Sequence, residues 1–351
     1  MDLRGSHLMT NRAVLYVTSS VFFTSKDNGD RMLTGKKRNI YFISLLTFCL
    51  VFVGSIPANA DDIEKLSQYE NGIVELYYQG KYVEALELAK EGLNWTQATF
   101  GSDSLANVLM IDKLGMLYEV FDQLDLSEQC YMTSLSILDK NFEKNDPGFT
   151  ATLVSLGELY RRQGRLADAE TVLMRAKNIN EAAYGPDTPK LKTVYNNLAM
   201  VLVDQGRTKE AENYYLRTIS ICRKNNLLDL DYATTLRNTA NLYIGMEKHE
   251  EAYPYVAEAL EFYDTEELSL HPSKGNLLGS LAAIAEYKQD LALAELCYVQ
   301  SFKIFVGCYG VNHHLTEASI RNVYSFYMDH GQDKNAQDFL DYVNSLVAKQ
   351  Q

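Results

Sequence analysis

Histidines are the first side chains to test for chemistry, because they bind metals and transfer protons near neutral pH. The chain has six, and one pair is adjacent, His313–His314. The pair follows Gly310, a residue typical of a helix end, so we interpret it as part of a turn rather than as a metal site. The sequence has no glycine-rich phosphate loop, no His-Glu-x-x-His and no Gly-x-Ser-x-Gly motif. These observations predict a non-enzymatic protein without cofactor or metal.

Cysteines could cross-link the chain if it reaches an oxidising compartment. Four follow residue 60, namely Cys130, Cys222, Cys297 and Cys308. Cys297 and Cys308 fall along one predicted helix, about 16 Å apart in helical rise. Cys130 lies four repeat units before Cys297, in the same phase of the repeat described next. Neither spacing suits a disulfide of ordinary geometry, so we predict unpaired cysteines that act as small buried hydrophobic residues.

The elements that carry these residues repeat along the chain. The clearest copy is Leu159-Tyr160, then Gly164, then Ala169-Glu170, and apolar residues recur at helical spacing on both sides of Gly164. A small residue closes each of seven copies at spacings of 42 residues, once 41: Ala85, Ser127, Ala169, Ala211, Ala252, Ala294 and Ala336. Two helices per unit cannot bury their apolar faces alone, so neighbouring units must stack into a solenoid. We expect Tyr160 to pack over the next unit.

Two kinds of turn separate the predicted helices. Within each unit the turn residue precedes the closing residue by about five positions: Gly80, Asp122, Gly164, Gly206, Glu247, Gln289 and Gly331. Glycine suits such a tight turn, so the three substituted units should turn with slightly more strain. Between units, glycine-containing segments such as 100–103, 184–189 and 309–314 predict the end of one helix and the start of another.

This repeat resembles the tetratricopeptide repeat, and its 42-residue period resembles the kinesin-light-chain type. The matching segments are 195–199, 236–243 and Ala252-Tyr253-Pro254, where we place Pro254 in the first turn of a helix. The resemblance covers residues 61–351 and implies an all-α fold, a right-handed α-α superhelical solenoid of seven helix pairs. It also implies binding of a peptide or protein on the concave face. The chain lacks the long heptad coiled coil of a kinesin light chain.

The resemblance implies that the first helix of each pair lines the concave groove. Asn197, Asn238 and Asn322 share one position in the repeat, and an asparagine amide can both donate to and accept from a peptide backbone. Arginines nearby could bind a carboxylate in a bidentate manner. Lys113 and Ser280 replace the asparagine in two units, which interrupts the series. The predicted peptide-binding residues are Asn197, Asn238, Asn322, Asn196, Arg237, Asn241, Arg321, Arg161 and Arg162. Alternatively, such asparagines bond to the neighbouring unit, and such arginines are solvated or ion-paired.

The charge of the chain restricts its partners. It has 33 Lys and Arg against 46 Asp and Glu, a net charge of -13, and the basic side chains are over-represented in the first 60 residues. A negatively charged protein lacks the positive footprint that nucleic acids and anionic membranes require. We therefore expect a protein or peptide ligand, and a basic segment would suit the overall charge.

The N-terminal segment has the features of an export signal. A basic group at 36–38 precedes an apolar run at 40–53 and small residues at 54–60, which predicts cleavage after Ala60. Met32 would then be the start of a signal peptide at 32–60, and 1–31 a non-native or mis-annotated extension. The remaining chain would be periplasmic or secreted. In the alternative, residues 40–57 stay uncleaved as an anchor, with the repeats still outside the cytosol.

The last predicted helix suggests self-association. Residues 336–348 contain five apolar side chains and no polar capping helix follows them: Phe339, Leu340, Val343, Leu346 and Val347. Because repeat arrays need a polar terminal face for solubility, an exposed apolar edge here could form a homo-oligomer. An alternative function is therefore a structural or assembly protein of an envelope complex, which would use its convex and terminal faces instead of a groove.

Overall fold

The computed structural model describes residues 59–265 and 268–350, so that the predicted extension at 1–31 and all but the last two residues of the predicted signal peptide at 32–60 lie outside the described residues. The described residues form fourteen α-helices, together with 3-10 turns at Pro147–Phe149 and Pro189–Leu191. The helices are α2 (Ala60–Tyr78), α3 (Tyr82–Phe100), α4 (Leu105–Val120), α5 (Leu124–Asn141), α6 (Thr150–Arg162), α7 (Leu166–Tyr184), α8 (Lys192–Asp204), α9 (Thr208–Lys224), α10 (Leu230–Gly245), α11 (His249–Glu261), α12 (Pro272–Tyr287), α13 (Leu291–Tyr309), α14 (His314–Asp329) and α15 (Asp333–Gln350).

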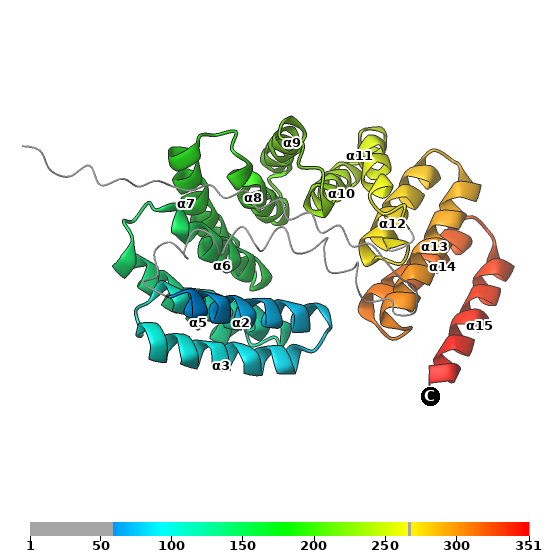
Figure 1. The fold of residues 1–351 in the computed structure, drawn as a ribbon. Coiled ribbons are helices and arrows are strands. Elements are labelled where there is room, and N and C mark those ends of the chain that lie inside the picture. The colour runs from blue at the N-terminus through cyan, green and yellow to red at the C-terminus, as the bar shows by residue number, and fades with distance from the viewer. Residues whose placement is uncertain (1–58, 266–267, 351) are drawn as a thin grey trace, which may run out of the picture.

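The helices pack as seven successive pairs, each made of a first and a second helix. The first helices of neighbouring units, from α2 through α12, also contact one another directly. In a curved stack, elements on the inner side lie closest together, so the first helices form the concave face. Figure 1 shows this arrangement, with α7, α9 and α11 outside α6, α8 and α10. The predicted all-α solenoid of seven helix pairs is confirmed.

In the second and third units, a glycine on the first helix lets its partner helix approach closely. At Gly157, an added Cβ would lie 2.6 Å from Leu173 Cγ, and at Gly115 it would lie 2.7 Å from the Tyr131 ring. Ala169, Leu173 and Tyr131 are almost completely buried. The contact therefore pairs a glycine on the first helix with a large side chain one turn beyond the closing residue on the second helix.

The seven predicted turn residues all adopt the left-handed conformation. Four are glycines, with φ from 65° to 76°, and the other three are Asp122, Glu247 and Gln289, with φ of 56°, 60° and 61°. A side chain at such a φ costs about 1 kcal/mol or more relative to glycine. The strain that the sequence predicted for these three units is therefore located at these residues.

Relieving this strain should stabilise the chain. We expect Glu247→Gly to raise the free energy of unfolding by about 0.5–1 kcal/mol, because glycine adopts a positive φ without a Cβ clash. Gly164→Ala, at the equivalent turn with φ 74°, should lower it by a similar amount. Thermal melts of both variants and the unmodified chain measure the two shifts, and shifts of the same sign would contradict this explanation.

Two local predictions are wrong. Pro254 is the sixth residue of α11, which begins at His249, so it lies beyond the first turn and leaves the Glu250 carbonyl without its helical donor. Tyr160 contacts the preceding unit through its hydroxyl, which donates to Glu128 Oε1 on α5 at 3.0 Å. The same hydrogen bond recurs from Tyr243 to Glu212 and from Tyr327 to Glu295. The Tyr and Ala-Glu elements of the motif thus form a bond between units.

The turns between units follow the expected pattern. Gly101, Gly185 and Gly310 end their helices with φ of 84°, 84° and 80°. His313 then begins α14 as its N-cap, with Nδ1 accepting from Leu315 N at 3.3 Å, and its ring stacks on Tyr309. The interpretation of this histidine as a turn residue is confirmed. The four cysteines of the described region form no disulfide. Cys222 and Cys297 are buried, as predicted, whereas Cys130 and Cys308 are only half-buried.

The C-terminal helix does not present the predicted apolar edge. Phe339 and Val343 are buried, while Leu340, Leu346 and Val347 are half-buried against the preceding helices. Amphipathic α15 turns these side chains inward and leaves its polar face to solvent, so it covers the end of the stack itself. The expectation of an exposed surface for self-association is wrong in this respect.

One described helix, α13, is long and apolar enough to cross a membrane, with a mean hydropathy of 1.4. Its position explains the composition, because α13 lies between α12 and α14 and contacts both. Six of its residues are buried, among them Cys297, Phe302 and Phe305. We therefore interpret α13 as a core helix of the solenoid.

Candidate functional site

The three asparagines that share one repeat position lie on α8, α10 and α14 with different exposure. Asn197 is buried, Asn238 is half-buried and Asn322 is exposed. Among the described residues, Asn197 and Asn322 have no side-chain hydrogen-bond partner. Asn238 Nδ2 donates to Asn196 Oδ1 at 3.3 Å. The structure thus places all three on first helices but does not give them equal access to the groove.

Asn196, Asn238 and Arg237 form one network that joins three units. The Arg237 guanidinium donates to Ser273 Oγ at 3.2 Å and to Asn238 Oδ1 at 3.4 Å. Burial lowers the pKa of Arg237, because desolvation disfavours the charged form and no carboxylate of the described residues forms an ion pair with it. These side chains therefore connect α8, α10 and α12 along the concave face, and a ligand here would have to compete with bonds between units.

The remaining predicted residues divide into engaged and available ones. Asn241 accepts from Ser280 at 2.9 Å, and Arg161 donates to Asp204 at 2.8 Å. Arg162 donates to the Glu119 carboxylate at 3.0 Å. Arg321 on α14 is exposed and has no ion-pair partner within the described residues. The alternative of bonding to a neighbouring unit therefore describes several of these side chains, whereas Arg321 and Asn322 remain accessible.

A cleft of about 560 Å³ opens on the first helices of the three N-terminal units. Its walls come from α2, α4 and α6, and Tyr131 of α5 also lines it. Lys113 and Ser155 in this cleft occupy the same repeat position as the three asparagines. The sequence analysis missed the cleft because it searched only for asparagine at this repeat position. Any residue at the position lies on the concave face, including Lys113 and Ser155.

Two ion pairs in this cleft neutralise both of its cations. Glu119 accepts from Tyr131 at 2.8 Å and from Arg162 at 3.0 Å. Lys113 Nζ lies 4.0 Å from Glu70, and both side chains are largely buried. Because each cation already faces a carboxylate, neither one is available to balance a further negative charge in the cleft.

Glu158 is a carboxylate of the cleft without such a partner. It has neither a hydrogen bond nor an ion pair with the described residues, although its side chain is exposed to the groove. Its pKa is raised, first because the surrounding concave walls desolvate the charge and next because of Glu119 nearby. Arg161 and Arg162 oppose the rise. Glu158 is therefore a carboxyl group of the cleft that forms no ion pair with the described residues and lies near another carboxylate, Glu119.

Asp112 is the most perturbed carboxyl group of the cleft. Thr152 Oγ1 donates to its Oδ2 at 2.7 Å, whereas Oδ1 is shielded from solvent and has no partner in the described part of the chain. Burial raises its pKa to about 6, and the nearby Ser134, Thr152 and Lys113 only partly oppose the rise. Ionisation of this buried aspartate therefore lowers the stability of the folded chain.

Replacing this carboxyl should therefore stabilise the chain near neutral pH. The folded pKa of about 6 exceeds the ordinary 3.8, so ionisation of Asp112 lowers stability as pH rises through 6. We expect Asp112→Asn to raise the free energy of unfolding at pH 7 by up to about 3 kcal/mol, and to have little effect at pH 4. Thermal melts at both pH values measure the difference, and equal destabilisation at both would contradict this account.

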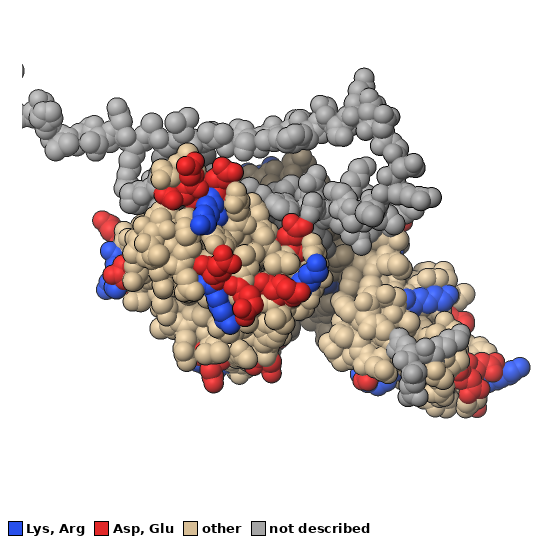
Figure 2. Space-filling model, turned by 60° about the horizontal axis from the view of Figure 1, so that its bottom comes forward, with Lys and Arg blue, Asp and Glu red and all other residues tan. Residues whose placement is uncertain are grey.

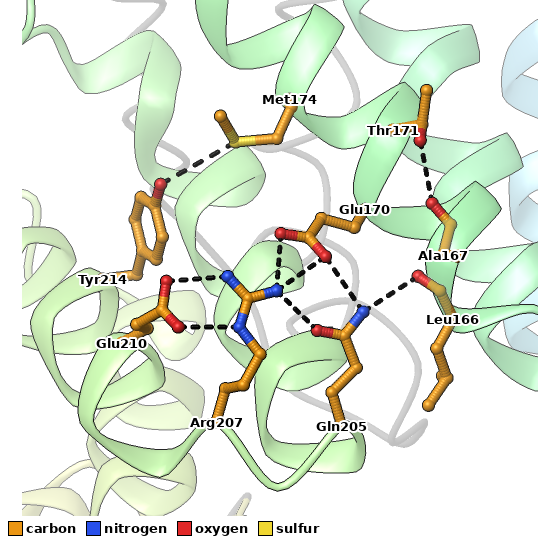
Figure 3. Close-up of polar contacts among 9 residues, drawn as sticks. All are labelled: Leu166, Ala167, Glu170, Thr171, Met174, Gln205, Arg207, Glu210 and Tyr214. Atoms are coloured by element: carbon orange, nitrogen blue, oxygen red, sulfur yellow. Dashed lines mark hydrogen bonds and ion pairs between the residues drawn. The ribbon is translucent and has the colours of Figure 1, made fainter.

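A second cavity, of about 850 Å³, lies on the outer side of the third unit along α7. Figure 3 shows the polar contacts at its edge. Arg207 Nη1 donates to both carboxylate oxygens of Glu170 at 2.7 Å, while Nε donates to Glu210 at 2.7 Å. Gln205 also donates to Glu170, at 3.0 Å. The contacts with Glu170 link the fourth unit to the third. We therefore interpret them as structural interactions between units and not as a binding site.

Charge on the surface is mixed. On the face shown in Figure 2, acidic and basic side chains are interspersed, and uncharged residues cover most of the area. Within the described residues no group of three or more His, Cys, Asp or Glu side chains is arranged to hold a metal ion. The features that distinguish the groove are therefore its unpaired carboxyls and amides.

Comparisons with known proteins agree with this geometry. The family model described as Tetratricopeptide repeat matches residues 149–224, which form the third and fourth units. No curated protein matches the chain.

Solved structures of similar fold include BtubC (BKLC) from P. vanneervenii, with 19% identity over 58% of this chain and 82% of that one, and a TM-score of 0.51. A protein of the kinesin-light-chain type from Podosopora anserina, with nearly identical TPR-like repeats, has 16% identity over 56% of this chain and 94% of its own, at a TM-score of 0.47. The APC/C hetero-tetramer Cut9-Hcn1 has 14% identity over 80% of this chain and 46% of that one, at a TM-score of 0.53.

Proposed function

The chain is a tetratricopeptide-repeat protein, and we propose that it is an exported, non-catalytic scaffold that binds a peptide or protein segment in its concave groove. Repeats of this kind typically mediate protein–protein interactions. The observation that carries the proposal is the concave cleft on α2, α4 and α6, where Glu158 and Asp112 leave polar atoms without partners. The accessible Arg321 and Asn322 at the other end of the first-helix series support it.

A capture experiment tests the role of the first helices. We expect the full chain to retain a protein partner from an envelope extract, and a variant with Asn197, Asn238 and Asn322 changed to Ala to lose it. The reason is that these amides supply donors and acceptors to an extended backbone. Quantitative mass spectrometry of both captures measures the loss, and circular dichroism checks that both chains fold equally.

The matched control changes three exposed asparagines on second helices, namely Asn178, Asn213 and Asn344, to Ala. Under the groove proposal this control captures the same partner as the unmodified chain. Loss of the partner only in the control would reverse the assignment, and it would favour the alternative of an assembly protein that uses its outer face. The cavity along α7, beside Asn178, is the specific feature that supports this alternative.

Export is proposed from the sequence features of residues 36–60. Asn59 and Ala60 adjoin the first repeat, where Asn59 caps α2 by accepting from Asp62 N at 2.9 Å. Cleavage after Ala60 would remove this cap and leave Asp61 and Asp62 in the first turn, where acidic residues suit the helix dipole. The mass of the exported chain decides the point, because cleavage predicts Asp61 as the first residue, and an intact N-terminus would indicate the anchor instead.

A further inference from the structure

The cleft on α2, α4 and α6 contains more negative than positive charge after its internal pairs are formed. Arg162 is committed to Glu119, and Lys113 lies next to Glu70. Asp112 and Glu158 then remain as two carboxyl groups that form no ion pair within the described residues, although Lys113 lies near Asp112 and Arg161 and Arg162 lie near Glu158. Asp112 has a shielded oxygen that accepts no hydrogen bond, although the Ser134 hydroxyl lies nearby, and Glu158 is exposed to the groove.

This inference rests on the proposed groove function and specifies its ligand. We propose that the cleft binds the cationic side chain of a lysine or arginine from the partner polypeptide, with Asp112 and Glu158 accepting its N–H groups. Both residues line the same cleft, Asp112 from α4 and Glu158 from α6. A guanidinium or ammonium group supplies the several donors that two carboxylates lack here.

The walls of the cleft suit the rest of such a side chain. Tyr77, Met116 and Val120 line it with apolar surface, and Val120 is 37% exposed. Lysine and arginine combine an aliphatic stem with a charged end, and they commonly lay the stem along apolar surface while the charge reaches a polar group. An acidic side chain would meet the opposite situation, because both local cations already have carboxylate partners. The net charge of -13 would also favour approach of a basic segment.

The Asp112 carboxyl lowers the stability of the folded chain near neutral pH, because burial disfavours its ionised form. A neutral amide could accept the Thr152 hydrogen bond equally well. A group that lowers stability because its neighbours compensate its charge only in part is characteristic of binding sites, where the ligand supplies a further partner.

Titration with two isosteric small probes tests the site. We would follow the full, isotope-labelled chain by NMR while adding N-acetyl-arginine methylamide or its neutral counterpart N-acetyl-citrulline methylamide. The expected result is saturable shifts at cleft residues with the arginine probe, and binding at least tenfold weaker with citrulline. Added salt should weaken the arginine probe only, because the attraction is electrostatic.

Variants connect this preference to the two carboxyls. Asp112→Asn and Glu158→Gln should each reduce affinity for the arginine probe at least fivefold, while Glu143→Gln, an exposed residue outside the cleft, should leave it unchanged. Asp112→Asn is expected to be more stable than the parent chain, so loss of binding there does not arise from unfolding.

Equal binding of the two probes, or absence of binding by both, would overturn the cation site. An arginine preference that survives in both variants would overturn the assignment of these residues. Each of these results would leave the groove proposal standing if capture still depends on the first helices, so the two failures are distinguishable.

Discussion

Replacing Gly157 by valine is expected to lower the free energy of unfolding by about 3 kcal/mol, the upper end of the cost of overpacking a core. The first carbon of the new side chain would lie 2.6 Å from Leu173 Cγ and 2.8 Å from Cδ2, closer than packed carbon atoms can approach. Leu173 is fully buried on α7, so it cannot move aside into solvent. Chemical denaturation followed by circular dichroism measures the change.

Two further variants separate this clash from a general effect of valine in a helix. Gly245→Val, where nothing lies within 4 Å of the added carbon, should change stability by less than about 0.5 kcal/mol. In Leu173→Ala the space opens, so that the double variant Gly157→Val/Leu173→Ala should be destabilised by less than the sum of the single changes. Strict additivity would show that the two helices do not meet at this contact.

Phe302→Ala is expected to cost about 3–5 kcal/mol, the range for removing a buried phenylalanine. Phe302 is 1% exposed and packs against Phe339 of α15 at a ring distance of 5.1 Å. Because each repeat unit contacts only its neighbours, the loss should be local. Hydrogen exchange should therefore show reduced protection in α13, α14 and α15 and unchanged protection in α2 to α7.

Leu296→Ala is the matched control on the same helix. Leu296 is 55% exposed, so its removal should change stability by less than about 0.5 kcal/mol. The comparison also tests our interpretation of α13 as a core helix. If α13 instead contacted lipid, both substitutions would act mainly through membrane affinity, and neither would affect protection of α15 in the water-soluble chain.

The periodic features of the fold were predictable from the sequence. A repeat of 42 residues determines the number of units, and the glycine positions predicted the tight turns, including the strained ones at Asp122 and Glu247, which adopt the left-handed conformation. These features follow from local backbone sterics and from the period of apolar residues. Tyr160 was assigned to the wrong neighbouring unit, because the repeat pattern does not show whether a side chain contacts the preceding or the following unit. Only the three-dimensional register shows that its hydroxyl reaches back to Glu128.

The candidate site was less predictable than the fold. Aligning one asparagine position identified residues on the concave face, but their exposure differs from Asn197 to Asn322 because the packing between units differs. Asp112 gave no signal in the sequence, because its state depends on burial and on a hydrogen bond from Thr152, which belongs to the next unit. Similarly, the apolar residues of 336–348 predicted an exposed edge, whereas the terminal helix folds them onto α14.

Site-specific photo-crosslinking in cells tests the central claim, that a polypeptide binds in the concave groove. A benzophenone amino acid would replace Asn71 or Asn322, which are exposed at the same repeat position on α2 and α14, and in control chains Asn178 or Asn213 on second helices. The account predicts that the same partner is cross-linked from both concave positions and from neither control. Cross-links confined to the second helices would contradict it, and would place binding on the outer face.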